Sequence, residues 1–144
     1  MKKITLLFIC LLSSIVFAQP GTIDFGFNSG GVGPDTAAYA TVTQPDGKII
    51  VAGTFDNYNG TTRSGIARLN ADGTLDLSFN PGTGLALSTE YIYCVALQTD
   101  GKIMIGGKFA NFNGTARNNI ARLNADGTVD ASFNPGTGTN NDVV

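Results

Sequence analysis

The stretch from Ile66 to Gly84 reads IARLNADGTLDLSFNPGTG, and it returns 54 residues later with only two substitutions. The wider segments 39–84 and 93–138 align without a gap and share 30 of their 46 residues. Tandem copies of about this length are typical of repeat proteins, in which each copy packs against its neighbours. The fold must therefore be read from the repeat unit.

Each unit predicts four short antiparallel strands separated by glycine-containing turns. In the first unit we expect strands at 39–44, 48–55, 65–70 and 74–80. Gly, Thr and Asn are frequent in these segments, and no window keeps the 3.6-residue period of an amphipathic helix. Period-two alternation with a turn every 8 to 12 residues is typical of an all-β protein. The predicted fold class is therefore all-β.

The turn at Asp72-Gly73 predicts the register of its hairpin. A two-residue loop would mix polar and apolar side chains on both faces. A three-residue loop with Gly73 in the left-handed conformation pairs Leu69 with Leu75, and it sets Arg68 opposite Asp76. We expect the three-residue loop. The arginine–aspartate pair recurs in both units, which favours a structural role over a catalytic one, and as an exposed pair it would be worth about 0–1 kcal/mol.

The second strand of each unit is a continuous apolar run, Ile49–Gly53 and its counterpart at 103–107. Such a run predicts a strand that is buried on both faces. The fourth strand instead alternates, with Leu75, Leu77 and Phe79 expected on one face. A four-stranded antiparallel sheet with a covered inner strand must lie between copies of itself, as a blade does in a β-propeller.

These residues resemble a known family. The motifs are Gln-(Pro/Thr)-Asp-Gly-Lys-Ile and Ile-Ala-Arg-Leu-Asn-Ala-Asp-Gly-Thr-(Leu/Val)-Asp-x-Ser-Phe, and they resemble the delta-60 repeat of bacterial exported proteins. The resemblance covers residues 21–138. It implies a β-propeller domain of unknown function and export from the cell. It supplies no catalytic or ligand-binding residues.

The units predict about two blades preceded by a leading strand at 21–28, within a partial propeller domain at 19–144. Propellers have roughly four to eight blades, so two blades would leave sheet faces and strand edges exposed. We therefore expect either that this sequence is the N-terminal part of a longer protein or that it assembles with copies of itself, and we prefer the first. Further repeats or self-association would then cover the blade faces.

The N-terminus predicts a signal peptide at 1–18. Lys2 and Lys3 precede an apolar core, and a small-residue cleavage site follows at Val16-Phe17-Ala18. Removal of this segment leaves 7 basic and 11 acidic residues, a net charge of −4. This charge argues against nucleic acid as a partner. The predicted location is outside the cell or on its surface, with no membrane span once the signal is removed.

Few residues suggest a site. Gly30–Asp35 matches a single copy of the calcium-binding motif Gly-Gly-x-Gly-x-Asp, but such sites need tandem copies. Asp56–Gly60 offers oxygen ligands for a cation, but its asparagines and glycine are explained more simply as residues of a tight turn. The loops also carry an aromatic and an arginine in each unit. These could bind a glycan or a protein by stacking, or they could fill the gap between blades and cap carbonyl groups. They are Tyr58, Arg63, Phe112 and Arg117.

The chain contains no histidine, and its recurring acids occupy turn or pairing positions. We therefore predict no catalytic residues, no metal site and no cofactor, and an exported non-catalytic propeller module with a binding or structural role. Asp35, Asp56, Glu90 and Asp142 are specific to one unit, and none has an evident partner in the sequence. The alternative is the N-terminal part of a propeller hydrolase whose catalytic residues lie in missing sequence.

Overall fold

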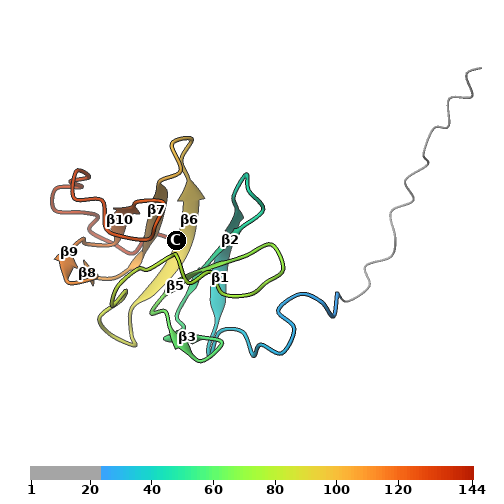
Figure 1. Cartoon of the computed structure of the whole chain (residues 1–144). Coiled ribbons are helices and arrows are strands. Elements are labelled where there is room, and N and C mark those ends of the chain that lie inside the picture. The colour runs from blue at the N-terminus through green and yellow to red at the C-terminus, as the bar shows by residue number, and fades with distance from the viewer. Residues whose placement is uncertain (1–23) are drawn as a thin grey trace, which may run out of the picture.

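The computed structural model describes residues 24–144 and is built of strands and turns, with no helix in that range (Figure 1). No segment of this range could therefore cross a membrane as a helix. The predicted signal peptide at 1–18 lies outside the described residues. The strands are β1 (Ala38–Thr43), β2 (Ile49–Gly53), β3 (Asn57–Tyr58), β4 (Thr61–Thr62), β5 (Ile66–Leu69), β6 (Tyr91–Leu97), β7 (Ile103–Lys108), β8 (Asn111–Phe112), β9 (Thr115–Ala116) and β10 (Ile120–Leu123).

Each repeat unit forms one three-stranded antiparallel sheet. The strand order is β1-β2-β5 in the first unit and β6-β7-β10 in the second, so the apolar second strand is central in both. The two sheets lie side by side, with β6 next to β1 and β2 (Figure 1). The all-β prediction is confirmed. Burial of the second strand on both faces is confirmed in the first unit, whereas Met104 on one face of β7 is only half-buried.

The predicted three-residue loops are also confirmed. The Asn70 amide donates to the Thr74 carbonyl at 2.8 Å, and Leu69 forms a bridge with Leu75. Gly73 has a φ of 83°, in the left-handed region that a side chain would disfavour. The earlier hairpin has the same geometry at Gly47, whose φ is 82°.

The predicted fourth strand is wrong beyond its first residues. After the bridge at Leu75, the chain turns at Asp76, whose Oδ1 accepts the Ser78 amide at 2.9 Å and the Ser78 hydroxyl at 2.7 Å. Aspartate and serine favour such turns because their side chains bond the nearby backbone. The alternation is therefore lost: Leu77 is 72% exposed, whereas Phe79 is fully buried.

The predicted leading strand at 21–28 is not a strand where the structure describes it. Residues 25–30 form turns, and residues 21–23 lie outside the described range. This segment instead repeats the contacts of the first unit's tail. The Asn28 amide donates to Asp72 O at 2.7 Å, as the Asn80 amide donates to Asp126 O at 2.8 Å. The segment thus covers the first unit as the tail of that unit covers the second.

Two short hairpins, β3–β4 and β8–β9, form at the loops that the sequence analysis left unpaired. Asn59 and Gly60 close the first of them with φ values of 48° and 74°. Asparagine and glycine tolerate this conformation better than other residues, so the Asn-Gly pair specifies the turn.

The main core lies between the two sheets. Side chains on one face of the first unit, such as Ile50 and Ile66, belong to one buried cluster with Ile103, Ile105 and Leu123 of the second unit. Burying a side chain of this size stabilises a protein by about 1.5–3 kcal/mol. The stacking of neighbouring units therefore supplies much of the hydrophobic core, as in a propeller.

Candidate functional site

Asp76 is the centre of the most strongly charged cluster in the first unit. Its Oδ2 accepts from Lys48 Nζ at 2.6 Å and from Arg68 Nε at 2.8 Å. Burial alone would raise the pKa of Asp76, but hydrogen bonds from Lys48, Ser78 and Arg68 outweigh burial and hold the pKa well below its usual value. The carboxylate is therefore ionised and fully engaged.

The same cluster recurs around Asp130, which binds Lys102 at 2.9 Å and Arg122 at 2.8 Å. Hydrogen bonds from Ser132 and Lys102 hold the pKa of Asp130 well below its usual value. The expectation of an exposed Arg–Asp pair is wrong, since Asp76, Asp130 and Arg68 are all buried. The structural role predicted for the pair still fits, because both copies have the same geometry and every carboxylate oxygen of Asp76 and Asp130 accepts a hydrogen bond.

Arg68 also joins the two units. Its Nη1 donates to the Ala125 carbonyl of the second unit at 2.6 Å, and its guanidinium lies 5.1 Å from the centre of the Phe79 ring. A Cβ at Gly127 would lie 3.1 Å from the same ring. The Ile-Ala-Arg-Leu and Asp-x-Ser-Phe motifs therefore hold one unit on the Asp-Gly turn of the next.

The predicted stacking residues Tyr58 and Phe112 are buried. Their rings pack edge-on against Phe55 and Phe109, with centroid separations of 6.1 Å and 6.4 Å. Burial raises the pKa of Tyr58. Neither ring presents a face on which a sugar could stack.

Arg63 and Arg117 donate to the backbone beside them, to the Thr62 and Ala116 carbonyls, each at 2.8 Å. They therefore cap carbonyl groups, as the structural interpretation expects. A ligand-binding role for either arginine stays a prediction.

Three of the four acids without an evident partner in the sequence, Asp35, Asp56 and Glu90, stabilise loops. Asp35 accepts the Asp56 amide at 3.0 Å, and hydrogen bonds led by the one from Asn57 lower the pKa of Asp35. Glu90 does the same in the second unit, accepting the Ala110 amide at 3.0 Å. Asp56 accepts the Ser64 hydroxyl at 3.1 Å. Within residues 24–144, no three His, Cys, Asp or Glu side chains are grouped as metal ligands.

A cleft of about 350 Å³ opens beside the second unit, where the two repeats differ most. Lys108 replaces Thr54, Ala110 replaces Asp56, and the loop residues Leu87 and Glu90 have no counterpart of the same type at the position 54 residues earlier. Thr89, Asn118, Asn119 and Asp142 complete its polar lining. A binding site needs residues that depart from the repeat, because recognition takes place at one position rather than at every unit.

Three tyrosines lie next to this cleft. Lys108 Nζ lies 5.6 Å from the centre of the Tyr91 ring, and the rings continue through Tyr93, 4.6 Å away, to Tyr39, another 5.3 Å away. Tyr39 is 51% exposed. A polar contact with the Tyr91 hydroxyl is the largest cause that raises the pKa of Tyr93, and the charge of Asp142 adds to it. The Tyr93 hydroxyl therefore stays protonated at neutral pH.

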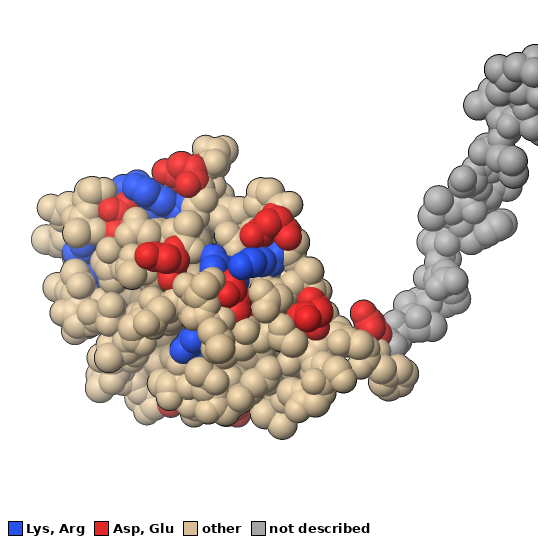
Figure 2. Space-filling model, viewed as in Figure 1, with Lys and Arg blue, Asp and Glu red and all other residues tan. Residues whose placement is uncertain are grey.

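The sequence did not predict that Lys108 and the tyrosines form one surface beside the cleft. A signal was available, since Tyr91 and Lys108 stand where the first unit has Ala37 and Thr54. Their proximity, however, depends on the pairing of β6 with β7, which sets Tyr91 opposite Lys108. Charge gives no further guide: in the view of Figure 2, acidic and basic side chains are interspersed.

A family model described as a domain of unknown function (DUF5122) beta-propeller matches residues 44–79 and 98–133, which together are half of the chain. The chain belongs to this family. The resemblance to delta-60 repeat proteins is thereby confirmed, as is the propeller class of the fold. Neither the curated proteins nor the solved structures contain a match.

The DUF5122 segments contain both lysine–aspartate–arginine clusters, from Lys48 to Asp76 and from Lys102 to Asp130. Tyr39, Tyr91 and Tyr93 lie outside them. The family match therefore covers the residues that hold the blades together, whereas the tyrosines lie on the first strand of each sheet, outside the matched segments.

Proposed function

We propose that this DUF5122 protein is an exported, non-catalytic propeller module that binds an extracellular ligand at the cleft and the adjoining tyrosines. Export is supported by the sequence of residues 1–18. The recurring acids are used in turns and ion pairs, whereas a catalytic role would require residues that depart from the repeat. The alternative of a propeller hydrolase gains no support from the contacts described above.

The observation that carries the proposal is the continuity between the cleft and the tyrosine surface. Lys108 lines the cleft and also lies over Tyr91. Binding sites for small ligands combine apolar and aromatic surfaces with a few polar groups that fix orientation. Here Tyr39 and Tyr93 provide aromatic surface, and the lysine, Asn118 and the carboxylate of Asp142 provide donors and acceptors.

This chemistry favours a glycan. Tyrosine rings can pack against the C–H faces of a sugar while polar side chains bond its hydroxyls, and tyrosine combines a large apolar surface with a polar tip. A protein ligand could use the same surface, because tyrosine is enriched at protein interfaces. The two ligand classes are separated by experiment.

The test is a glycan array probed with the purified chain, followed by titration of each hit against variants. Tyr91→Ala and Lys108→Ala should each weaken binding about tenfold or more, the loss expected for a contact worth roughly 1.4 kcal/mol. Thr54→Ala is the matched control, since Thr54 holds the equivalent position in the first unit, and it should leave binding unchanged. Equal affinity for all three variants would refute the cleft as the site.

Export is tested separately by N-terminal sequencing of the protein recovered outside the cytoplasm of a bacterial host. Processing after Ala18, with Gln19 as the new N-terminus, is the expected result. Full-length protein retained in the cytoplasm would contradict export.

A further inference from the structure

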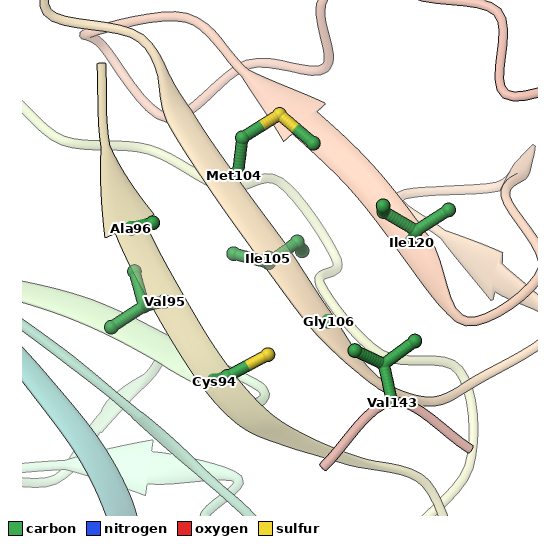
Figure 3. Close-up of a pocket in the computed structure, with 8 residues that line it drawn as sticks. All are labelled: Cys94, Val95, Ala96, Met104, Ile105, Gly106, Ile120 and Val143. Atoms are coloured by element: carbon green, nitrogen blue, oxygen red, sulfur yellow. The ribbon is translucent and has the colours of Figure 1, made fainter.

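The second unit has an open apolar face that the first unit buries. A groove of about 120 Å³ crosses this face between β6, β7 and β10 (Figure 3). Met104 and Ile120 project into it and are half-buried, whereas their counterparts in the first unit, Ile50 and Ile66, are fully buried against the second unit. The exposure differs because the first unit packs against the second, whereas the described residues provide no third unit to cover the second.

The polar groups around this face show the same difference. Arg68 Nη1 donates to the Ala125 carbonyl, but Nη1 of Arg122 has no acceptor among residues 24–144. The side chain of Arg68 is 10% exposed and that of Arg122 is 21% exposed. Asn80 donates its amide across the unit boundary, and the described residues offer no such acceptor to Asn134. The apolar side chains of this face, together with Arg122 and Asn134, are therefore arranged to contact a surface like the one that the second unit presents to the first.

We propose that this face binds the first unit of a second copy of the chain, head to tail. The required complement is an Asp-Gly turn preceded by alanine, because the internal interface uses the Ala125 carbonyl and the Asp126-Gly127 turn. The first unit of a second copy presents the same sequence at Ala71-Asp72-Gly73. Arg122 would then bond the partner's Ala71 carbonyl, and Phe133 would pack on the partner's Gly73.

Phe27 already lies on that turn. A Cβ at Gly73 would lie 2.8 Å from the Phe27 ring, yet Phe27 remains 42% exposed, whereas Phe79 in the same position on the second unit is fully buried. The guanidinium of Arg122 lies 4.9 Å from the centre of the Phe133 ring. On the partner's Gly73, this Phe133 would replace the half-exposed Phe27. The exchange removes apolar surface from water, which favours association.

The proposal is tested by sedimentation velocity of the purified chain over a range of concentrations. The wild-type chain should associate reversibly. Met104→Asp should weaken association by at least about tenfold, because it places an unpaired charge in the interface. Leu77→Asp is the control for surface hydrophobicity, since Leu77 is exposed and lies outside the groove, and it should have no effect.

Two further variants keep the test decisive. Arg122→Ala leaves the core intact and should weaken association even if Met104→Asp misfolds, as circular dichroism would reveal. Phe27→Ala should strengthen association, because it weakens the segment that competes for Gly73. A wild-type chain that stays monomeric would overturn the proposal. Association that Phe27→Ala leaves unchanged would indicate face-to-face pairing and would also overturn it, and so would association lost in Leu77→Asp.

Discussion

Replacing Arg68 or Arg122 with alanine compares the same side chain with and without a neighbouring unit. Both arginines bond an aspartate at 2.8 Å and lie over a phenylalanine ring. Only Arg68 also bonds the Ala125 carbonyl, at 2.6 Å. The two variants therefore differ mainly by one bond across the unit boundary.

We expect Arg68→Ala to lower the free energy of unfolding by about 2–4 kcal/mol, because it removes charged hydrogen bonds and leaves the buried Asp76 with Lys48 as the one cation bonded to it. Arg122→Ala should cost less. The difference between them should be about 1.5–3 kcal/mol, the net value of a hydrogen bond from a charged donor.

The assay is urea unfolding followed by far-ultraviolet circular dichroism, at a concentration where the chain is monomeric. The slope with denaturant should be similar for both variants, so that midpoints report stability. Equal losses for the two variants, or a larger loss for Arg122→Ala, would refute the view that Arg68 fastens one unit to the next.

Two other predictions concern the same contacts. Because the pKa of Asp76 is lowered on folding, its contribution to stability is present above the ordinary aspartate pKa of about 3.9 and is lost as the pH falls toward the lower folded value. Asp76→Asn should therefore reduce the loss of unfolding free energy that the wild-type chain shows between about pH 5 and pH 2. An unchanged dependence of stability on pH in this range would contradict the assignment. Gly127→Ala and Gly136→Ala both place a side chain at positive φ, but only the first meets the Phe79 ring. Thermal unfolding should therefore show a larger loss of stability for Gly127→Ala, by about 1–3 kcal/mol. Similar losses of stability for the two variants would show that this contact is unimportant.

Sequence reasoning succeeded where a local pattern carries the whole signal. The Asp72-Gly73 turn determines its own loop length, and the run Ile49–Gly53 has no polar residue to turn toward solvent. Both features can therefore be predicted from the sequence without knowledge of the fold.

It failed where a side chain competes with the backbone. The alternation of Leu75, Leu77 and Phe79 is the pattern of a strand, but the carboxylate of Asp76 bonds Ser78 and bends the chain. The burial of Arg68 was also missed, because the residues that cover it belong partly to the other unit.

The tyrosine surface could not be predicted for a similar reason. Tyr39 and Tyr91 lie in different units, and their approach depends on how β1 and β6 pack together. Comparing the two units position by position identifies Tyr91 and Lys108 as residues that depart from the repeat, but the structure is needed to show that they meet the recurring Tyr39 and Tyr93.

Amide hydrogen exchange at Asn80 tests most directly whether the two units stack as neighbouring blades. The Asn80 amide donates to Asp126 O at 2.8 Å across the boundary, although the residue itself is exposed to solvent. Asn134 is the internal reference, as the same residue type at the equivalent position. At a concentration where the chain is monomeric, Asn80 should exchange much more slowly than Asn134. Rapid exchange at both positions would show that the units do not pack on each other in this way.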